Sequence, residues 1–164
     1  MLRKRAFDIL RTDYVVIGPQ DSFGDAVRRL FTHLAHTPDM DAAALVGPDG
    51  FVGVADSSDM LAALGDCAVD DGLRLSLGAS DFEPVFAAQC RTCLGRPALE
   101  MLAARDGETP VAGPRDALVL VLDAMRQAGA RFAAVVDGGR VLGLLSARDI
   151  LGEFARLAET SRGI

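Results

Sequence analysis

The chain has 164 residues, of which 50% are hydrophobic and 24% are charged, and its formal net charge is −6. These values are typical of a folded protein with one compact domain or two small ones, and they argue against a disordered chain. An acidic chain is not expected to bind nucleic acid, because phosphate recognition needs basic patches. No apolar run approaches the roughly 18–20 residues of a membrane span. The mean hydropathy of +0.25 therefore predicts an apolar subunit interface.

The N-terminal residues and the cysteines predict a cytoplasmic protein. The basic start is followed at once by Asp8 and Asp13, not by an apolar segment, so no secretory signal peptide is expected. Three cysteines are an odd number, which argues against a disulfide framework. A single lysine beside many arginines and abundant alanine is typical of a GC-rich bacterial genome.

One sequence pattern occurs twice along the chain. Gly-Pro-Gln-Asp at residues 18–21 returns as Gly-Pro-Arg-Asp at residues 113–116, an offset of 95. Residues 53–59 return as residues 143–149, an offset of 90, and a longer connection near residues 36–41 absorbs the difference. Upstream of each copy, residues 6–10 resemble residues 98–102. The chain therefore contains an internal repeat.

The first copy begins with an expected strand at residues 14–17 and a Gly-Pro-x-Asp turn whose Asp21 is expected to cap a helix. The helix that follows is amphipathic, with an apolar stripe at Phe23, Val27, Leu30, Phe31 and Leu34. A hairpin is expected from strands at residues 43–46 and 51–54, joined by Gly-Pro-Asp-Gly. A second helix is expected near residues 57–64.

The second copy has the same order: a strand at residues 109–112, a helix, strands at 133–136 and 141–145, and a helix at 147–157. Its first helix carries an equivalent apolar stripe at Leu118, Val121, Leu122 and Met125. One β-α-β-β-α unit is too small to bury much core, so two units should pack together. The predicted fold class is α+β, a pseudo-twofold pair with a first repeat at residues 1–65, an insert at 66–96 and a second repeat at 97–164.

The insert is too long for a structureless loop inside a compact protein. Residues 73–77 alternate in polarity like a strand with one polar face. We therefore expect an ordered insert in which Leu73, Leu75, Leu77 and Phe86 are buried. It would either cover a cleft or extend a dimer interface.

Cys90 and Cys93 form a Cys-x-x-Cys pattern that allows three interpretations. A zinc site would need about four ligands, with Cys67 and His33 or His36 completing it. A redox motif would open a helix after a strand, and no such unit is evident. Buried, unreactive thiols are the favoured interpretation, with the two histidines in structural or surface positions.

Residues 134–151 read Ala-Val-Val-Asp-Gly-Gly-Arg-Val-Leu-Gly-Leu-Leu-Ser-Ala-Arg-Asp-Ile-Leu and resemble the end of a CBS domain. The shared features are a hydrophobic strand, a glycine hairpin and a Gly-x-x-Ser-x-x-Asp motif. With the repeat, the resemblance covers the chain except about residues 66–96. It implies a tandem CBS pair, usually dimerised, that is regulatory and not an enzyme. It also implies an adenosine-containing ligand such as AMP, ADP, ATP or S-adenosylmethionine between the repeats, and a regulated protein partner that the sequence does not name.

By this resemblance Ser146 approaches the phosphate or ribose of the ligand, and Asp149 accepts hydrogen bonds from the ribose hydroxyls. The chemistry is consistent, because free N–H groups at a helix start attract phosphate and Arg148 adds positive charge. A carboxylate such as Asp149 only accepts hydrogen bonds, which suits a diol. The alternative is that Ser146 and Asp149 form an ordinary helix cap.

The resemblance further implies an apolar clamp for adenine and a basic phosphate contact at Arg131. The alternatives are plain core packing and a solvated arginine. In the first copy Asp56 stands where the family has Ser or Thr and would repel phosphate, although Asp59 is retained, so at most one good site is expected. No catalytic residues, metal site or cofactor are predicted. The clamp residues are Val111, Ala112, Ala133, Ala134 and Leu142.

The two first helices differ on their outer faces. The first helix has a polar face at Asp25, Arg28, Arg29 and Thr32, whereas Val119, Leu120 and Ala124 occupy this face in the second copy. A helix that is apolar on both sides is usually buried on both sides. We therefore expect a homodimer whose interface includes these three residues. The alternative is that the insert covers them within one chain.

Overall fold

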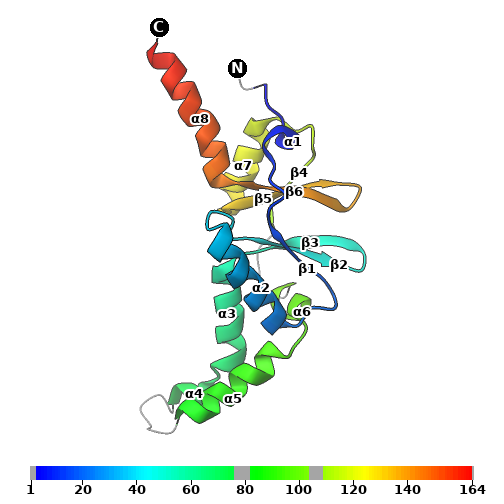
Figure 1. Ribbon diagram of the computed structural model, residues 1–164, viewed down its shortest axis with the longest axis vertical. Coiled ribbons are helices and arrows are strands. Elements are labelled where there is room, and N and C mark those ends of the chain that lie inside the picture. The colour runs from blue at the N-terminus through cyan, green and yellow to red at the C-terminus, as the bar shows by residue number, and fades with distance from the viewer. Residues whose placement is uncertain (1–2, 76–81, 104–108, 164) are drawn as a thin grey trace.

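The computed structural model describes residues 3–75, 82–103 and 109–163 (Figure 1). The elements follow in chain order: α1 (Ala6–Ile9), β1 (Val15–Ile17), α2 (Phe23–His36), β2 (Ala43–Gly47), β3 (Gly50–Ala55), α3 (Ser57–Ala68), α4 (Asp71–Leu75), α5 (Phe82–Leu94), α6 (Ala98–Ala103), β4 (Val111–Ala112), α7 (Leu118–Ala128), β5 (Phe132–Asp137), β6 (Arg140–Ser146) and α8 (Ala147–Arg162).

Two three-stranded sheets have the same topology, which confirms the α+β fold with a repeated β-α-β-β-α unit. Their strand orders are β1-β2-β3 and β4-β5-β6. In each sheet the first strand pairs in parallel with the second, and the second pairs antiparallel with the third. A register shift follows Leu45 in one sheet and Val135 in the other, 90 residues later. The repeat in the sequence is therefore a repeat in structure.

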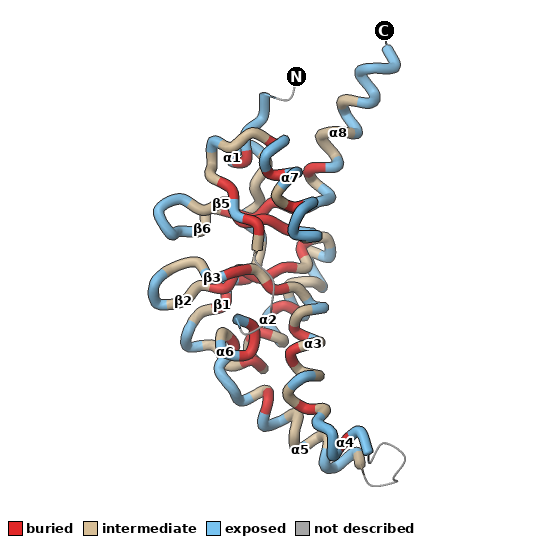
Figure 2. The backbone as a smooth tube through the Cα atoms, turned by 180° about the vertical axis from the view of Figure 1, so that it is seen from behind, coloured by how far each residue is buried: buried red, intermediate tan, exposed pale blue. Residues whose placement is uncertain are grey.

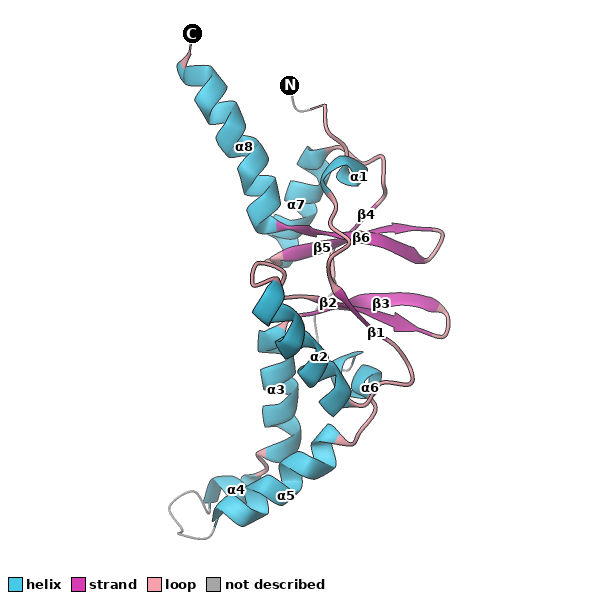
Figure 3. Cartoon of the chain, viewed as in Figure 1, coloured by secondary structure: helices cyan, strands magenta, loops and turns pink. Residues whose placement is uncertain are grey.

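The two sheets lie one above the other in the middle of the molecule, with helices beside them and at both ends (Figures 1 and 3). Buried Met40 and Ala42 pack there against Phe132, Ala134 and Leu144 of the second sheet. Figure 2 shows the buried segments running through this centre. At the hairpin tips the backbones approach closely: a Cβ at Gly50, where φ is +118°, would lie 2.7 Å from the carbonyl oxygen of Gly139. Only glycine suits this position.

A short helix precedes each repeat in the sequence, α1 before the first and α6 before the second, and each packs on the other repeat. The segment around α1 packs on the second repeat, where the Ala6 N–H donates to the Asp116 carbonyl. The segment around α6 packs on the first repeat, where the Phe23 N–H donates to the Arg96 carbonyl. Each repeat thus completes its core with a helix that the sequence places beside the other repeat. The boundaries at residues 65 and 97 remain a prediction.

Asp21 does not cap α2, contrary to the expectation from the Gly-Pro-x-Asp turn. Its carboxylate accepts from the Gly18 N–H at 2.8 Å and closes the turn, and Asp116 does the same with Gly113. Ser22, one residue later, is the N-cap of α2. The aspartate is used in the turn because its short side chain reaches the backbone three residues before it.

The insert forms helices where a strand was expected. Asp70 accepts from the Leu73 N–H at 2.7 Å and starts α4, so residues 73–75 are helical although their alternation predicted a strand. Leu73 is buried, but Leu75 is 90% exposed, which contradicts the expectation for that residue. Phe86 is half-buried against the first core, and Leu77 lies outside the described residues. The next helix, α5, packs against α3.

The favoured interpretation of Cys90 and Cys93 as unreactive thiols is wrong for Cys93, because Cys67 and Cys93 form a disulfide. The bond joins the ends of α3 and α5, two positions that the sequence separates by 26 residues. Cys90 is the free cysteine of the described residues. The described parts of the chain hold no group of three or more histidine, cysteine or acidic residues placed to bind a metal ion.

Candidate functional site

The first turn of α8 holds the Gly-x-x-Ser-x-x-Asp motif at the end of β6. Ser146 is buried, and its Oγ accepts from the Asp149 N–H at 3.0 Å. The next N–H, of Ala147, donates to the Arg131 carbonyl at 2.8 Å. Ser146 is therefore a helix cap, as the alternative interpretation held. That bond uses an oxygen lone pair, and the hydroxyl proton can still donate elsewhere.

The carboxylate of Asp149 differs from its counterpart in the first copy. Asp59 returns to its own helix cap and accepts from the Asp56 N–H at 3.0 Å, which closes a capping box. Ser146 still belongs to the β5–β6 ladder, paired with Phe132, and no such box forms there. Asp149 Oδ2 is buried, and no described residue donates a hydrogen bond to it. An unpaired buried acceptor is costly, so this oxygen is suited to an incoming donor.

Arg11 is the closest cationic group to this oxygen. Its guanidinium lies 3.9 Å from Asp149 Oδ2 and 2.6 Å from Asp39 Oδ2, and it also contacts Asp13. Hydrogen bonds to Asp13 and Asp39 raise the pKa of Arg11 above its ordinary value, and the Arg11 hydrogen bond lowers the pKa of Asp39. Asp39 is also 3.7 Å from the exposed Arg148. Two cations therefore lie near the start of α8: Arg11, which is already paired with Asp13 and Asp39, and the exposed Arg148.

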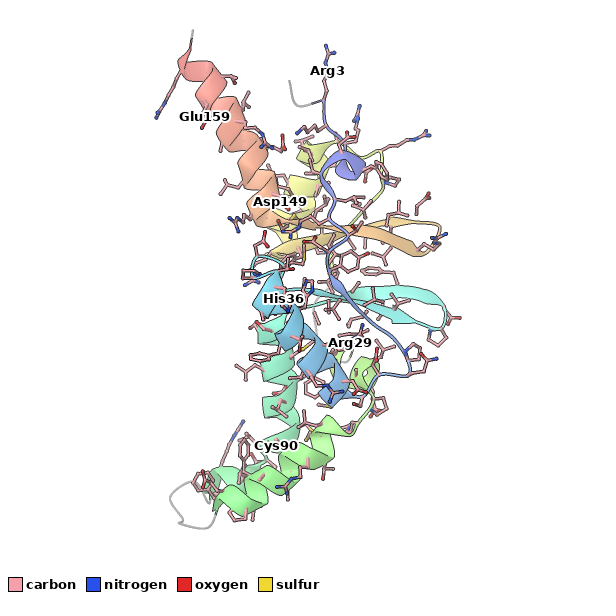
Figure 4. The ribbon with its side chains drawn as sticks, in the orientation of Figure 1. Arg3, Arg29, His36, Cys90, Asp149 and Glu159 are labelled. Atoms are coloured by element: carbon pink, nitrogen blue, oxygen red, sulfur yellow. A yellow bond between two sulfur atoms is a disulfide. The ribbon has the colours of Figure 1, made fainter. Side chains whose placement is uncertain are left out.

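A pocket of about 390 Å³ opens beside this turn, between α1 and α8. Figure 4 labels Asp149 at the start of α8. The pocket includes Asp149, Arg148 and Gly152 together with Lys4 and Arg156. Glu153 contacts both Lys4, at 3.0 Å, and Arg156, so one carboxylate compensates two cations. The volume falls within the range of small-molecule sites. Asp8 also lines the pocket, so three basic side chains face three carboxylates, and an anion would bind beside Arg148 and Arg156.

The first copy fills its own helix start with protein side chains. Asp41 accepts from the N–H and the hydroxyl of Ser57, at 3.0 and 2.7 Å. Asp56 caps α3, and burial raises the pKa of its carboxyl group. Arg131 lies 3.3 Å from Asp41 and 3.7 Å from Asp56. Phosphate would meet two carboxylates here, which supports the expectation that this copy is unsuited to it.

The remaining predicted site residues do not gather around Asp149. The Arg131 side chain pairs with Asp41 and Asp56 of the first copy, and only its carbonyl contacts the start of α8. Ala112, Ala133 and Ala134 are buried in the cores between elements, and Leu142 packs against the second core. Val111 is 54% exposed and lines a separate pocket with Phe51. Their contact with a ligand remains a prediction.

Four residues near the two helix starts were not predicted from the sequence: Arg11, Asp39, Asp41 and Lys4. Arg11 and Lys4 precede the first strand, where a solvated charge is the usual interpretation. Asp41 was detectable, because the offset of 90 aligns it with Arg131. Equivalent residues of two repeats can pair when they lie near the axis that relates the repeats, and here their charges are opposite.

Comparisons with known proteins show which family the α8 motif and the two-sheet fold resemble. Residues 110–156 match the CBS domain family model. A CBS domain-containing protein of unknown function from Kribbella flavida is similar in structure, with a TM-score of 0.67, 19% identity and coverage of 93% of this chain and 98% of that one. No match was found among curated proteins.

Two further structures are informative about ligands. A CBS domain protein from Pyrobaculum aerophilum, complexed with AMP, has a TM-score of 0.59 and 21% identity, with coverage of 93% of this chain and 99% of that one. Hypoxic Response Protein I, with two coordinated zinc ions, has a TM-score of 0.60 and 17% identity, with coverage of 92% and 98%. At these identities the likeness shows the fold.

Among the described residues no helix has the length and apolar character needed to cross a membrane. The repeat, the two matching sheets and the motif of α8 are consistent with the fold of CBS-domain proteins. The chain contains a CBS domain at residues 110–156 and has the two-repeat fold of CBS-domain proteins.

Proposed function

We propose that this protein is a non-enzymatic regulatory module that binds an adenosine-containing ligand at the first turn of α8. The observation that carries the proposal is the buried Asp149 Oδ2, which receives no hydrogen bond from the described residues. A ribose hydroxyl is a donor of the right kind for it. Arg148 and Arg11 supply positive charge near the same turn for the phosphate.

The comparisons support this choice of ligand class. The Pyrobaculum aerophilum protein is complexed with AMP, as is the CBSX2 protein, whose structure is also similar to this chain. The first copy contributes little to the proposal, since Asp41 and Asp56 occupy its helix start. We therefore propose one site per chain.

Thermal unfolding in the presence of AMP tests this proposal. A ligand that binds only the native state stabilises it by about 2.7 kcal/mol at a hundredfold excess over its dissociation constant. The midpoint should rise with AMP, and it should rise less with 2′,3′-dideoxy-AMP, which lacks both hydroxyls for Asp149. Inorganic phosphate is the control for charge alone. Equal shifts with AMP and phosphate, or no shift with AMP, would contradict the proposal.

A second candidate function is a dimerisation or protein-interaction module without a ligand. The supporting observation is the outer face of α7, where Val119 and Leu120 are 64% and 59% exposed. The described helices of the insert pack on α2 and α3 and do not cover this face. Burial of these side chains against a second copy would remove apolar surface from water.

A further inference from the structure

Three cysteines converge where the end of α3 meets α5. Cys67 on α3 is bonded to Cys93 on α5, with their Cα atoms 6.1 Å apart. Cys90 lies one helical turn before Cys93, and all three side chains contribute to the same core cluster. Figure 4 labels Cys90 on α5 beside this junction. From this placement we propose that the three form a thiol–disulfide exchange site.

The free thiol is close enough to its target. Residues three apart on a helix share a face, and helix geometry places their Cα atoms about 5 Å apart. Disulfides form at Cα separations of roughly 4.4–6.8 Å. A bond between Cys90 and Cys93 therefore fits on α5 and would replace the bond that joins the two helices.

Burial and charge set the direction of the exchange. Cys93 is only 2% exposed, so a thiol from solvent reaches it poorly, whereas Cys90 approaches along the same helix. Cys67 is half-buried, and the Arg96 guanidinium donates to its sulfur at 3.6 Å. A neighbouring cation stabilises a thiolate and makes it the better leaving group. Arg96 also binds Glu100 at 2.6 Å, which holds the guanidinium in place.

In the exchange the Cys90 thiolate attacks the Cys93 sulfur. One S–S bond forms between Cys90 and Cys93, the Cys67–Cys93 bond breaks, and the electron pair leaves on Cys67. Cys90 gives its proton to water, and the Cys67 thiolate takes one up, so no electrons are gained or lost. An external thiol then reduces the Cys90–Cys93 bond in two steps and becomes a disulfide itself. The outcome is that α3 and α5 are no longer covalently joined.

The two bonding patterns are directly measurable. Trypsin cleavage after Arg29, Arg74, Arg91 and Arg105 places Cys67, Cys90 and Cys93 in separate peptides, 30–74, 75–91 and 92–105. The folded protein is equilibrated with glutathione at several ratios of its reduced and oxidised forms. Alkylation in acid-quenched, denatured samples blocks free thiols before digestion and mass spectrometry. Cys90→Ser, which keeps the disulfide, is the matched control.

The proposal predicts two linked pairs in the wild type: 30–74 with 92–105, and 75–91 with 92–105 together with alkylated Cys67. The second pair should be absent from Cys90→Ser, and Arg96→Gln should lower its share while Arg96→Lys preserves it. Detection of the first pair alone at every ratio, up to full reduction, would overturn the proposal. A glutathione adduct on Cys90 without any bond between Cys90 and Cys93 would overturn it equally.

Discussion

Asp41 and Arg131 occupy equivalent positions in the two repeats, 90 residues apart, and they contact each other at 3.3 Å. Asp41 lies two residues before β2, and Arg131 directly precedes β5, the second strand of the other sheet. The pseudo-twofold relation therefore brings them together at the seam between the repeats. Two identical charged residues at these positions would repel each other, but an acidic and a basic residue form an ion pair. This pair lies at the N-terminus of α3 in the first copy, where Asp41 also binds the Ser57 N–H.

Because of Asp41, a phosphate site in the first copy cannot be restored by a change at Asp56 alone. Asp56→Thr alone restores the family's residue but leaves Asp41 on the Ser57 N–H. We expect no additional AMP site in Asp56→Thr, and a gain in stoichiometry or affinity for phosphate ligands in the double variant Asp41→Ala/Asp56→Thr. Calorimetry of both variants against the wild type checks this. A gain with Asp56→Thr alone would show that Asp41 does not block the site.

The half-buried Asp56 should make stability depend on pH. Its pKa is raised above 3.8, chiefly by burial, so the folded state holds this proton more tightly than the unfolded state. The resulting loss of stability develops as the pH rises from about 3.8 through the raised pKa. Asp56→Asn keeps a capping side chain and removes the charge. The variant should therefore gain stability over the wild type as the pH rises through this window.

Denaturant unfolding of both proteins at a series of pH values measures this difference. Asp49→Asn, in the exposed turn between β2 and β3, is the control for a change of net charge. The wild-type curve alone is not informative, because Asp39 and Glu153 have lowered pKa values and act in the opposite direction. A difference between Asp56→Asn and wild type that shrinks with rising pH would contradict the account.

The disulfide should contribute strongly to stability. Closing a loop across a sequence separation of 26 residues corresponds to about 3–4 kcal/mol in the chain-entropy model. Cys67→Ala/Cys93→Ala should lose about this much unfolding free energy under non-reducing conditions, whereas Cys90→Ala keeps the bond and should lose less. A loss below about 1 kcal/mol in the double variant would mean that the unfolded chain is not restrained by the bond.

Much of the fold was predictable from the sequence because it depends on local patterns. The repeat offsets, the glycine hairpins and the strand of residues 133–136 all correspond to observed elements. The strand expected at residues 73–77 was wrong for residues 73–75, because the capping residue Asp70 starts a helix there. The disulfide was missed because Cys67 and Cys93 meet only through the packing of α3 on α5.

The candidate site was predictable only in part, for a similar reason. Ser146 and Asp149 lie in one helical turn, and their capping bond follows from their spacing. Arg11 and Asp39 reach the same turn from other segments, and no pattern near residue 149 indicates them. Asp149 Oδ2 receives no hydrogen bond from its own helix cap because β6 extends one residue further than β3 and includes Ser146, which a motif does not show.

The exposed face of α7 predicts self-association. We expect a homodimer whose interface includes Val119, Leu120 and Ala124, because burying the two large side chains removes apolar surface from water. Leu120→Asp should give a folded monomer, since the charge would be desolvated in the interface. Size-exclusion chromatography with light scattering measures this, with Thr32→Asp on the exposed face of α2 as the control. A monomeric wild type at tens of micromolar would contradict the prediction.

The most direct test is AMP binding by titration calorimetry to three proteins: wild type, Asp149→Asn and Asp59→Asn. Asp149 and Asp59 are equivalent, but only the Asp59 carboxylate is committed to its own helix cap. The account predicts one AMP per chain, an unchanged affinity in Asp59→Asn, and a loss of about 1.5–3 kcal/mol in Asp149→Asn, which is roughly tenfold to a hundredfold in Kd. Equal affinity of folded Asp149→Asn and wild type for AMP, or no AMP binding by the wild type, would contradict it.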